Sequence, residues 1–159
     1  MDYRLVEKDA FEIVGKGIQV STVNGENQRA IPAFWDESNR NGFSDELAKN
    51  CGPLGLLGVC MQFDPVNQEF TYFIAAEKTG DDVPSDWEVR EIPAASWAVF
   101  ESVGPMPHAI QNVWERIYSE WFPQSGYEHA DAPEMEVYLE GDIDSENYRC
   151  EVWIPVMNK

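Results

Sequence analysis

The feature that most constrains the fold of this chain is an order of segments that occurs twice. Each half predicts a strand, then a helix, then two strands. In the first half, residues 11–21, 56–63 and 70–76 have the composition of strands, and Asp64 to Asn67 form the expected turn of a hairpin. Between the first two strands, Ile31, Phe34 and Trp35 recur at helical spacing. We expect Pro32 in the first turn of this helix and Asn41-Gly42 at its end.

The second half repeats this order after a polar segment at residues 78–85. Strands are predicted at 87–92, 95–103, 134–140 and 148–156. A helix opens after Gly104-Pro105-Met106-Pro107, and Pro123 follows its end. Its apolar face consists of Ile110, Val113, Trp114, Ile117 and Trp121.

Two units of this size would bury little surface alone, so we expect them to pair. The prediction is an α+β fold with a tandem β-α-β-β repeat and pseudo-two-fold symmetry. Antiparallel sheets would enclose a central groove, with the helices on the outer faces. Residues 1–159 would form a single effector-binding domain, with halves of about 1–79 and 80–159.

The last strand carries two different faces. Tyr148, Cys150, Val152, Ile154 and Val156 form an apolar face. The opposite face sets the carboxylate of Glu151 beside the indole of Trp153, and both groups attract positive charge. This alternation is also typical of an ordinary solvated strand face.

The preceding strand supplies the other predicted site residues. Its apolar residues are expected to face the helix, so Glu136 and Tyr138 would lie beside Glu151 and Trp153 across the hairpin. In the first half, Phe73 occupies the position equivalent to Glu151 and could supply a further ring. A carboxylate among aromatic rings suits a flat or hydrophobic cation, because ion pairing and cation–π contacts both strengthen away from water.

Charge narrows the classes of partner. Eleven basic residues against 29 acidic ones give a net charge of −18. This balance disfavours direct binding of nucleic acid or anionic membranes and favours cationic ligands. No long apolar segment or signal peptide is visible, so we expect a cytoplasmic protein, and Cys51, Cys60 and Cys150 are expected to be free thiols.

Signals for catalysis are few. The two histidines, His108 and His129, lie at a helix start and in an acidic loop, and neither completes a catalytic triad or a metal motif. We therefore predict no metal, no cofactor and no defined set of catalytic residues. General acid–base chemistry by Glu136 or Glu151, assisted by Tyr138, stays open as an alternative.

Taken together, the doubled order, the strand Met135-Glu136-Val137-Tyr138 and the closing segment from Cys150 to Val156 resemble the GyrI-like, or AraC-type effector-binding, domain family. This family includes the ligand domains of the Rob and BmrR regulators. The resemblance implies a groove that binds lipophilic cations and other drugs, with Glu151 at the position of the family's key glutamate. It also suggests a stand-alone bacterial member, of a kind that mobile integron cassettes can encode.

Several functions remain compatible with this resemblance. The leading hypothesis is a sensor or sequestration module that binds small hydrophobic cations at Glu151, Trp153, Tyr138, Glu136 and Phe73. One alternative is a hydrolase of electrophilic, cyclopropane-type toxins that uses the same carboxylates. Another is an interaction protein whose partner is a regulator or a topoisomerase.

Overall fold

The computed structural model describes residues 1–49 and 52–159, so Cys51 lies outside the described residues. The described chain forms two compact units. Unit 1 contains Met1–Ala10 and Pro93–Lys159, and unit 2 contains Phe11–Ile92. Each unit places a helix between the first and second strands of a β-α-β-β series, and the strands within each unit are antiparallel. The predicted α+β class is confirmed.

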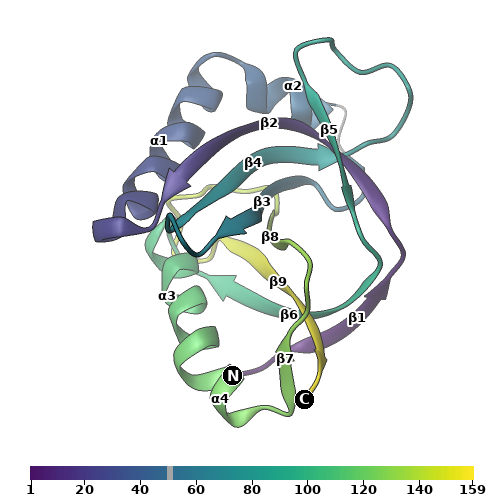
Figure 1. Cartoon of the computed structure of the whole chain (residues 1–159). Helices are drawn as coiled ribbons and strands as arrows, with labels where there is room; N and C mark the ends of the chain where they lie inside the picture. The colour runs from purple at the N-terminus through teal and green to yellow at the C-terminus, as the bar shows by residue number, and fades with distance from the viewer. Residues whose placement is uncertain (50–51) are drawn as a thin grey trace. The chain divides into compact units, whose positions relative to one another are not determined.

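Unit 2 has four strands in the order β3-β4-β2-β5 (Figure 1). The strands are β2 (Phe11–Ser21), β3 (Leu56–Asp64), β4 (Glu69–Glu77) and β5 (Glu88–Ile92). A short 3-10 turn, η1 (Val23–Gly25), leads into helix α1 (Glu26–Arg40), which is followed by α2 (Phe43–Lys49). The carboxylate of Asp64 accepts the backbone N–H groups of Val66 and Asn67 and so fixes the predicted β3–β4 turn.

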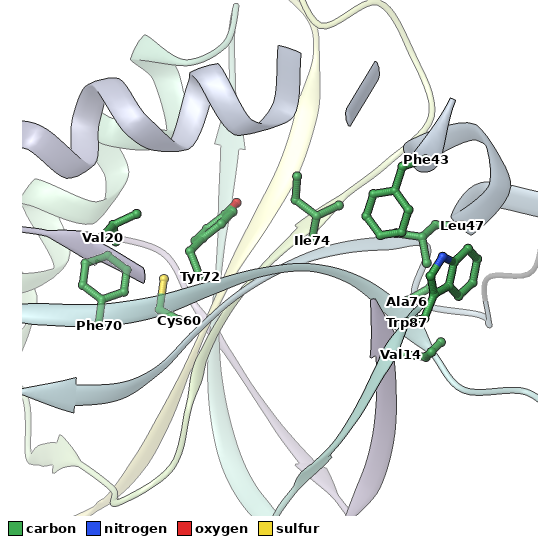
Figure 2. Close-up of a cluster of buried hydrophobic side chains, with 10 residues drawn as sticks. All are labelled: Val14, Val20, Phe43, Leu47, Cys60, Phe70, Tyr72, Ile74, Ala76 and Trp87. Carbon is green, nitrogen blue, oxygen red and sulfur yellow. The ribbon is translucent and has the colours of Figure 1, made fainter. Parts of the chain in front are cut away.

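One face of these strands packs on the helices. Phe70, Tyr72 and Ile74 alternate along β4 and point to the same side (Figure 2). Phe43 of α2 meets Trp87 edge to face, with ring centroids 5.5 Å apart. The alternation along β4 therefore leaves Phe73 on the face of unit 2 that its helices do not cover.

Unit 1 has the strand order β1-β6-β9-β8, and β7 also pairs with β9. The strands are β1 (Arg4–Lys8), β6 (Ala95–Val103), β7 (Tyr127–His129), β8 (Glu134–Tyr138) and β9 (Arg149–Asn158). Helix α3 (His108–Arg116) continues as a π-helical segment, η2 (Ile117–Trp121), and ends in α4 (Phe122–Gln124). Its apolar residues pack on the face of β6 and β9 that carries Phe100, Val152 and Ile154. The apolar face predicted for the last strand is confirmed.

The structure differs from the predicted halves at both ends of unit 2. Strand β1 pairs with β6 in unit 1, and β5 pairs with β2 in unit 2. The units are therefore divided at Ala10 and Ile92, whereas the predicted halves met at residue 79. Composition marked the polar segment at 78–85, but it could not show which strand pairs with which.

Several local predictions also need correction. Pro32 lies inside α1 rather than in its first turn, because the helix begins at Glu26. Strand β7 was expected to be a loop, and helix α2 was not predicted; both are short, so their periodicity gives little signal. Cys60 and Cys150 are buried thiols. Within the described residues, no helix combines the length and apolar character needed to cross a membrane.

Candidate ligand-binding site

The register of the β8–β9 hairpin decides which predicted site residues lie together. Met135 pairs with Trp153, and Val137 pairs with Glu151. Residues paired across a ladder share a face, so Glu136 and Tyr138 lie on the opposite face of the sheet from Glu151 and Trp153. The prediction that these four side chains converge on one surface was wrong.

The error has a physical cause. Both faces of β8 are buried: Met135 and Val137 are 0% and 1% exposed, and Glu134 and Glu136 are each 7% exposed. Where both faces are covered, apolar and polar alternation cannot identify the helix side. The polar face of β8 is in fact the one that meets α3.

Glu136 is the centre of an acidic-aromatic cluster on this helix-bearing face of unit 1. The indole N–H of Trp114 on α3 donates to Glu136 Oε2 at 2.9 Å. The hydroxyl of Tyr138 donates to Glu136 Oε1 at 2.7 Å. Both donors are neutral, and both rings are half-buried. We call Trp114, Glu136 and Tyr138 the Glu136 cluster.

Sequence patterns placed Trp114 in the helix core and did not identify it as part of a site. The available signal was chemical. A Trp on the border of an apolar helix stripe brings an N–H that needs an acceptor when it is buried. Glu134 and Glu136, on the strand that follows the helix, are the acceptors that such a donor can reach.

Glu151 has a different partner. The guanidinium of Arg4 on β1 lies 2.8 Å from Glu151 Oε2, and the indole N–H of Trp153 donates to Glu151 Oε1 at 3.1 Å. Trp153 is only 4% exposed and packs on Trp97, with ring centroids 5.9 Å apart. Glu151 and Trp153 are thus adjacent as predicted, but the chain itself already supplies a cation to this carboxylate.

Phe73 has a similar resident cation. Its side chain is 2% exposed, and the guanidinium carbon of Arg90 lies 5.1 Å from its ring centroid. This arrangement is a cation–π contact within unit 2. The position of Phe73 away from the helices agrees with the prediction, whereas its role as a wall for a ligand remains a prediction.

Burial and charge also shape the core beside the Glu136 cluster. Cys150 pairs with Tyr138 across the hairpin. Burial raises the pKa of the Cys150 thiol to about 11, and the charges of Glu136 and Glu151 add to this rise, while Ser102 opposes it. Burial likewise raises the pKa of Tyr148 to about 12. These groups stay neutral near pH 7 and contribute no charge to the site.

A separate depression in unit 1 lies near the ends of β1 and β6. Its volume is about 350 Å³, and its lining residues are Glu7, Lys8, Asp9, Ala94, Ala95 and Ser96. None of these residues is aromatic, and the hydroxyl of Ser96 donates to Glu7 at 2.6 Å. The depression lacks the rings that a hydrophobic cation requires, so the Glu136 cluster is the better candidate.

Comparisons with known proteins agree with this architecture. The structure of SAV2435 bound to tetraphenylphosphonium superposes with a TM-score of 0.88 at 25% identity, covering 99% of this chain and 94% of that one. A protein from Staphylococcus aureus MU50 gives a TM-score of 0.82 at 26% identity, covering 99% of both chains.

An integron cassette protein of Vibrio cholerae, VCH_CASS2, shares the fold, with a TM-score of 0.68, 14% identity and coverage of 98% and 95%. None of the curated proteins matches the chain. One family matches residues 1–157, nearly the whole length, and it is described as the GyrI-like small molecule binding domain. The predicted resemblance is therefore confirmed, and the chain belongs to the GyrI-like family of small-molecule-binding domains.

Proposed function

We propose that this protein binds small hydrophobic cations and that Glu136 is the anion that holds them. The observation that carries the proposal is a carboxylate only 7% exposed whose Trp114 and Tyr138 partners are neutral aromatic donors. The tetraphenylphosphonium bound to SAV2435 is a cation of this class, which supports the proposal by similarity.

The energetics favour a cation with apolar substituents. A buried carboxylate is costly unless hydrogen bonds or a counter-charge compensate it. Hydrogen bonds from neutral donors such as Trp114 and Tyr138 add no counter-charge, whereas a bound cation adds an ion pair in a medium of low dielectric constant. The half-buried rings of Trp114 and Tyr138 add cation–π attraction of about 0.5–2 kcal/mol each. Hydrophobic substituents on the ligand add area removed from water.

Glu151 is the weaker candidate because Arg4 already pairs with it. A ligand at Glu151 would have to compete with a tethered guanidinium, whose effective concentration is high. The biological role that we propose is that of a sensor or a sequestration module for such cations.

The test is calorimetric titration of the wild-type protein, Glu136→Gln and Glu151→Gln with tetraphenylphosphonium. Glutamine keeps the shape and an acceptor oxygen at either position, so the pair of variants is matched. We expect Glu136→Gln to weaken binding by about 30-fold or more, since it removes one partner of a buried charge pair. Glu151→Gln should change the dissociation constant less than about threefold.

The reverse ranking would move the site to the face of Glu151 and Trp153 and would overturn the assignment to Glu136. Circular dichroism and thermal melting of both variants establish that any loss of binding is not a loss of folding.

One observation favours a second function, hydrolysis of an electrophilic compound. The hydroxyl of Tyr138 lies 2.7 Å from Glu136, a distance suited to proton transfer between an acid and a base. Turnover of a strained cyclopropane-bearing substrate that Tyr138→Phe abolishes, while tetraphenylphosphonium affinity is kept, would favour the enzyme. A protein that binds the cation and turns over no such substrate is a binder.

A further inference from the structure

A second buried carboxylate lies next to the Glu136 cluster. Glu134 precedes Glu136 by two residues on β8, so both side chains lie on the helix-bearing face, about 7 Å apart along the strand. Glu134 is also 7% exposed. Its Oε1 accepts a short hydrogen bond from the hydroxyl of Tyr118 and lies 2.8 Å from His129 Nε2.

Aromatic residues connect the two carboxylates. Trp114 and Tyr118 are one turn apart, their rings are stacked at an angle of 11°, and their centroids are 6.4 Å apart. Trp114 donates to Glu136, and Tyr118 donates to Glu134. Tyr118 belongs to the π-helical segment η2, a type of irregularity that is frequent at functional sites. One layer of aromatic side chains therefore separates Glu134 and its partners from Glu136, and a change in the net charge around Glu134 acts at short range on Glu136.

His129 is the titratable partner of Glu134. Its Nδ1 lies 2.5 Å from the carbonyl oxygen of Ala130, and its Nε2 faces the Glu134 carboxylate. Both ring nitrogens thus face acceptors, and only the imidazolium can donate to both at once.

The surroundings of His129 contain few other charges. Asp131 adds a negative charge from the following loop. The ring centroid of Phe122 on α4 lies 6.3 Å from that of His129, and Val156 of β9 pairs with His129 across the sheet. Burial tends to lower the pKa of His129, but the hydrogen bond and charge of Glu134, with the contributions of Ala130 and Asp131, outweigh it and raise that pKa above its usual range. The side chain is 30% exposed, so protons can reach it.

We propose that the His129–Glu134 pair regulates the Glu136 site, so that the protein binds cations more weakly when His129 is protonated. This inference rests on the proposed function of the Glu136 cluster. In the protonated pair, the charge of the imidazolium offsets that of Glu134, so the pair adds no net charge next to the Glu136 cluster. When His129 loses its proton, the negative charge of Glu134 is no longer offset by the imidazolium, and it attracts a cation bound at the Glu136 cluster.

The sign of the effect follows from this electrostatic argument. His129 is protonated below its folded pKa, so affinity is lowest there and rises as the pH rises through that pKa. Coupling is reciprocal, so a bound cation must raise the acid dissociation constant of His129 by the same factor and thereby lower its pKa. For charges separated by about 7 to 10 Å in a partly buried setting, we expect an effect of about fivefold.

The experiment is a calorimetric titration with tetraphenylphosphonium, whose charge is independent of pH, from about pH 5.5 to about pH 9, the range in which histidines titrate. The wild-type protein should gain about fivefold in affinity across this range. His129→Gln should be flat with pH. His108→Gln is the matched control, because the exposed His108 at the start of α3 is the other histidine of the chain and should leave the rise unchanged.

Two further measurements guard against a misfolded variant. Glu134→Gln should move the rise to lower pH, because His129 loses the carboxylate that raises its pKa. Imidazole NMR signals of the wild-type protein should show a lower His129 pKa in saturating tetraphenylphosphonium. Binding whose pH dependence is the same in His129→Gln as in the wild type overturns this inference alone. An absence of binding at every pH overturns the proposed function, and this inference with it.

Discussion

At the scale of single residues, two glutamates of one hairpin have opposite surroundings. Glu136 is held by the indole of Trp114 and the hydroxyl of Tyr138, both neutral. Glu151 is held by the guanidinium of Arg4. Hydrogen bonds from neutral donors add no positive charge, whereas the guanidinium of Arg4 offsets the charge of Glu151 within the chain. Partners, rather than residue type, therefore determine which carboxylate suits a cation.

The reactivity of Cys150 tests whether water reaches the core beside the Glu136 cluster. Its thiol is 1% exposed, and burial raises its pKa to about 11. Because the thiolate is the reactive form, Cys150 should resist iodoacetamide near pH 8 in the folded protein and react readily in urea. Peptide mass spectrometry separates Cys150 from the other two cysteines. Rapid labelling of Cys150 in the folded state would mean that water reaches this core.

At the scale of elements, the sequence predicted which segments form strands and helices better than it predicted which face of each strand meets a helix. The strand at residues 11–21 and the end of α1 at Arg40 agree with the structure, because hydrophobic periodicity and the Asn41-Gly42 signal are local properties. The prediction of which face of β8 meets the helix was wrong, because both faces are buried and the alternation of apolar and polar residues then cannot tell them apart. The pairing of β1 with β6 was also missed, since register between distant strands has no local signal.

The packing of β2 between β4 and β5 gives a sharp prediction for a single methyl group. A Cβ at Gly15 would lie 2.1 Å from the carbonyl oxygen of Ile74 and 2.8 Å from the Cα of Ala75, and both are backbone atoms that cannot rotate away. Gly15→Ala should therefore lower the free energy of unfolding by about 3 kcal/mol or more.

Gly80→Ala is the matched control, because nothing lies within 4 Å of the position of its added Cβ. Urea denaturation should place this control within about 0.5 kcal/mol of the wild-type protein. Equal stability of the two variants would contradict the close approach of β2 and β4 at Gly15.

At the scale of the whole molecule, the net charge of −18 attracts every cation to some degree. This general attraction falls steeply with salt, because exposed charges are screened over about 8 Å at physiological ionic strength. Binding at the partly buried Glu136 cluster should be screened much less. Salt dependence therefore separates the proposed site from the acidic surface.

The central claim is that the protein recognises hydrophobic shape and positive charge together. The most direct measurement compares tetraphenylphosphonium with tetraphenylborate, which has nearly the same shape and the opposite charge, by calorimetry at low and at moderate salt. We predict saturable one-to-one binding of the cation that persists at moderate salt, and no binding of the anion. Equal affinity for both ions, or cation binding that disappears when salt is added, would contradict the account.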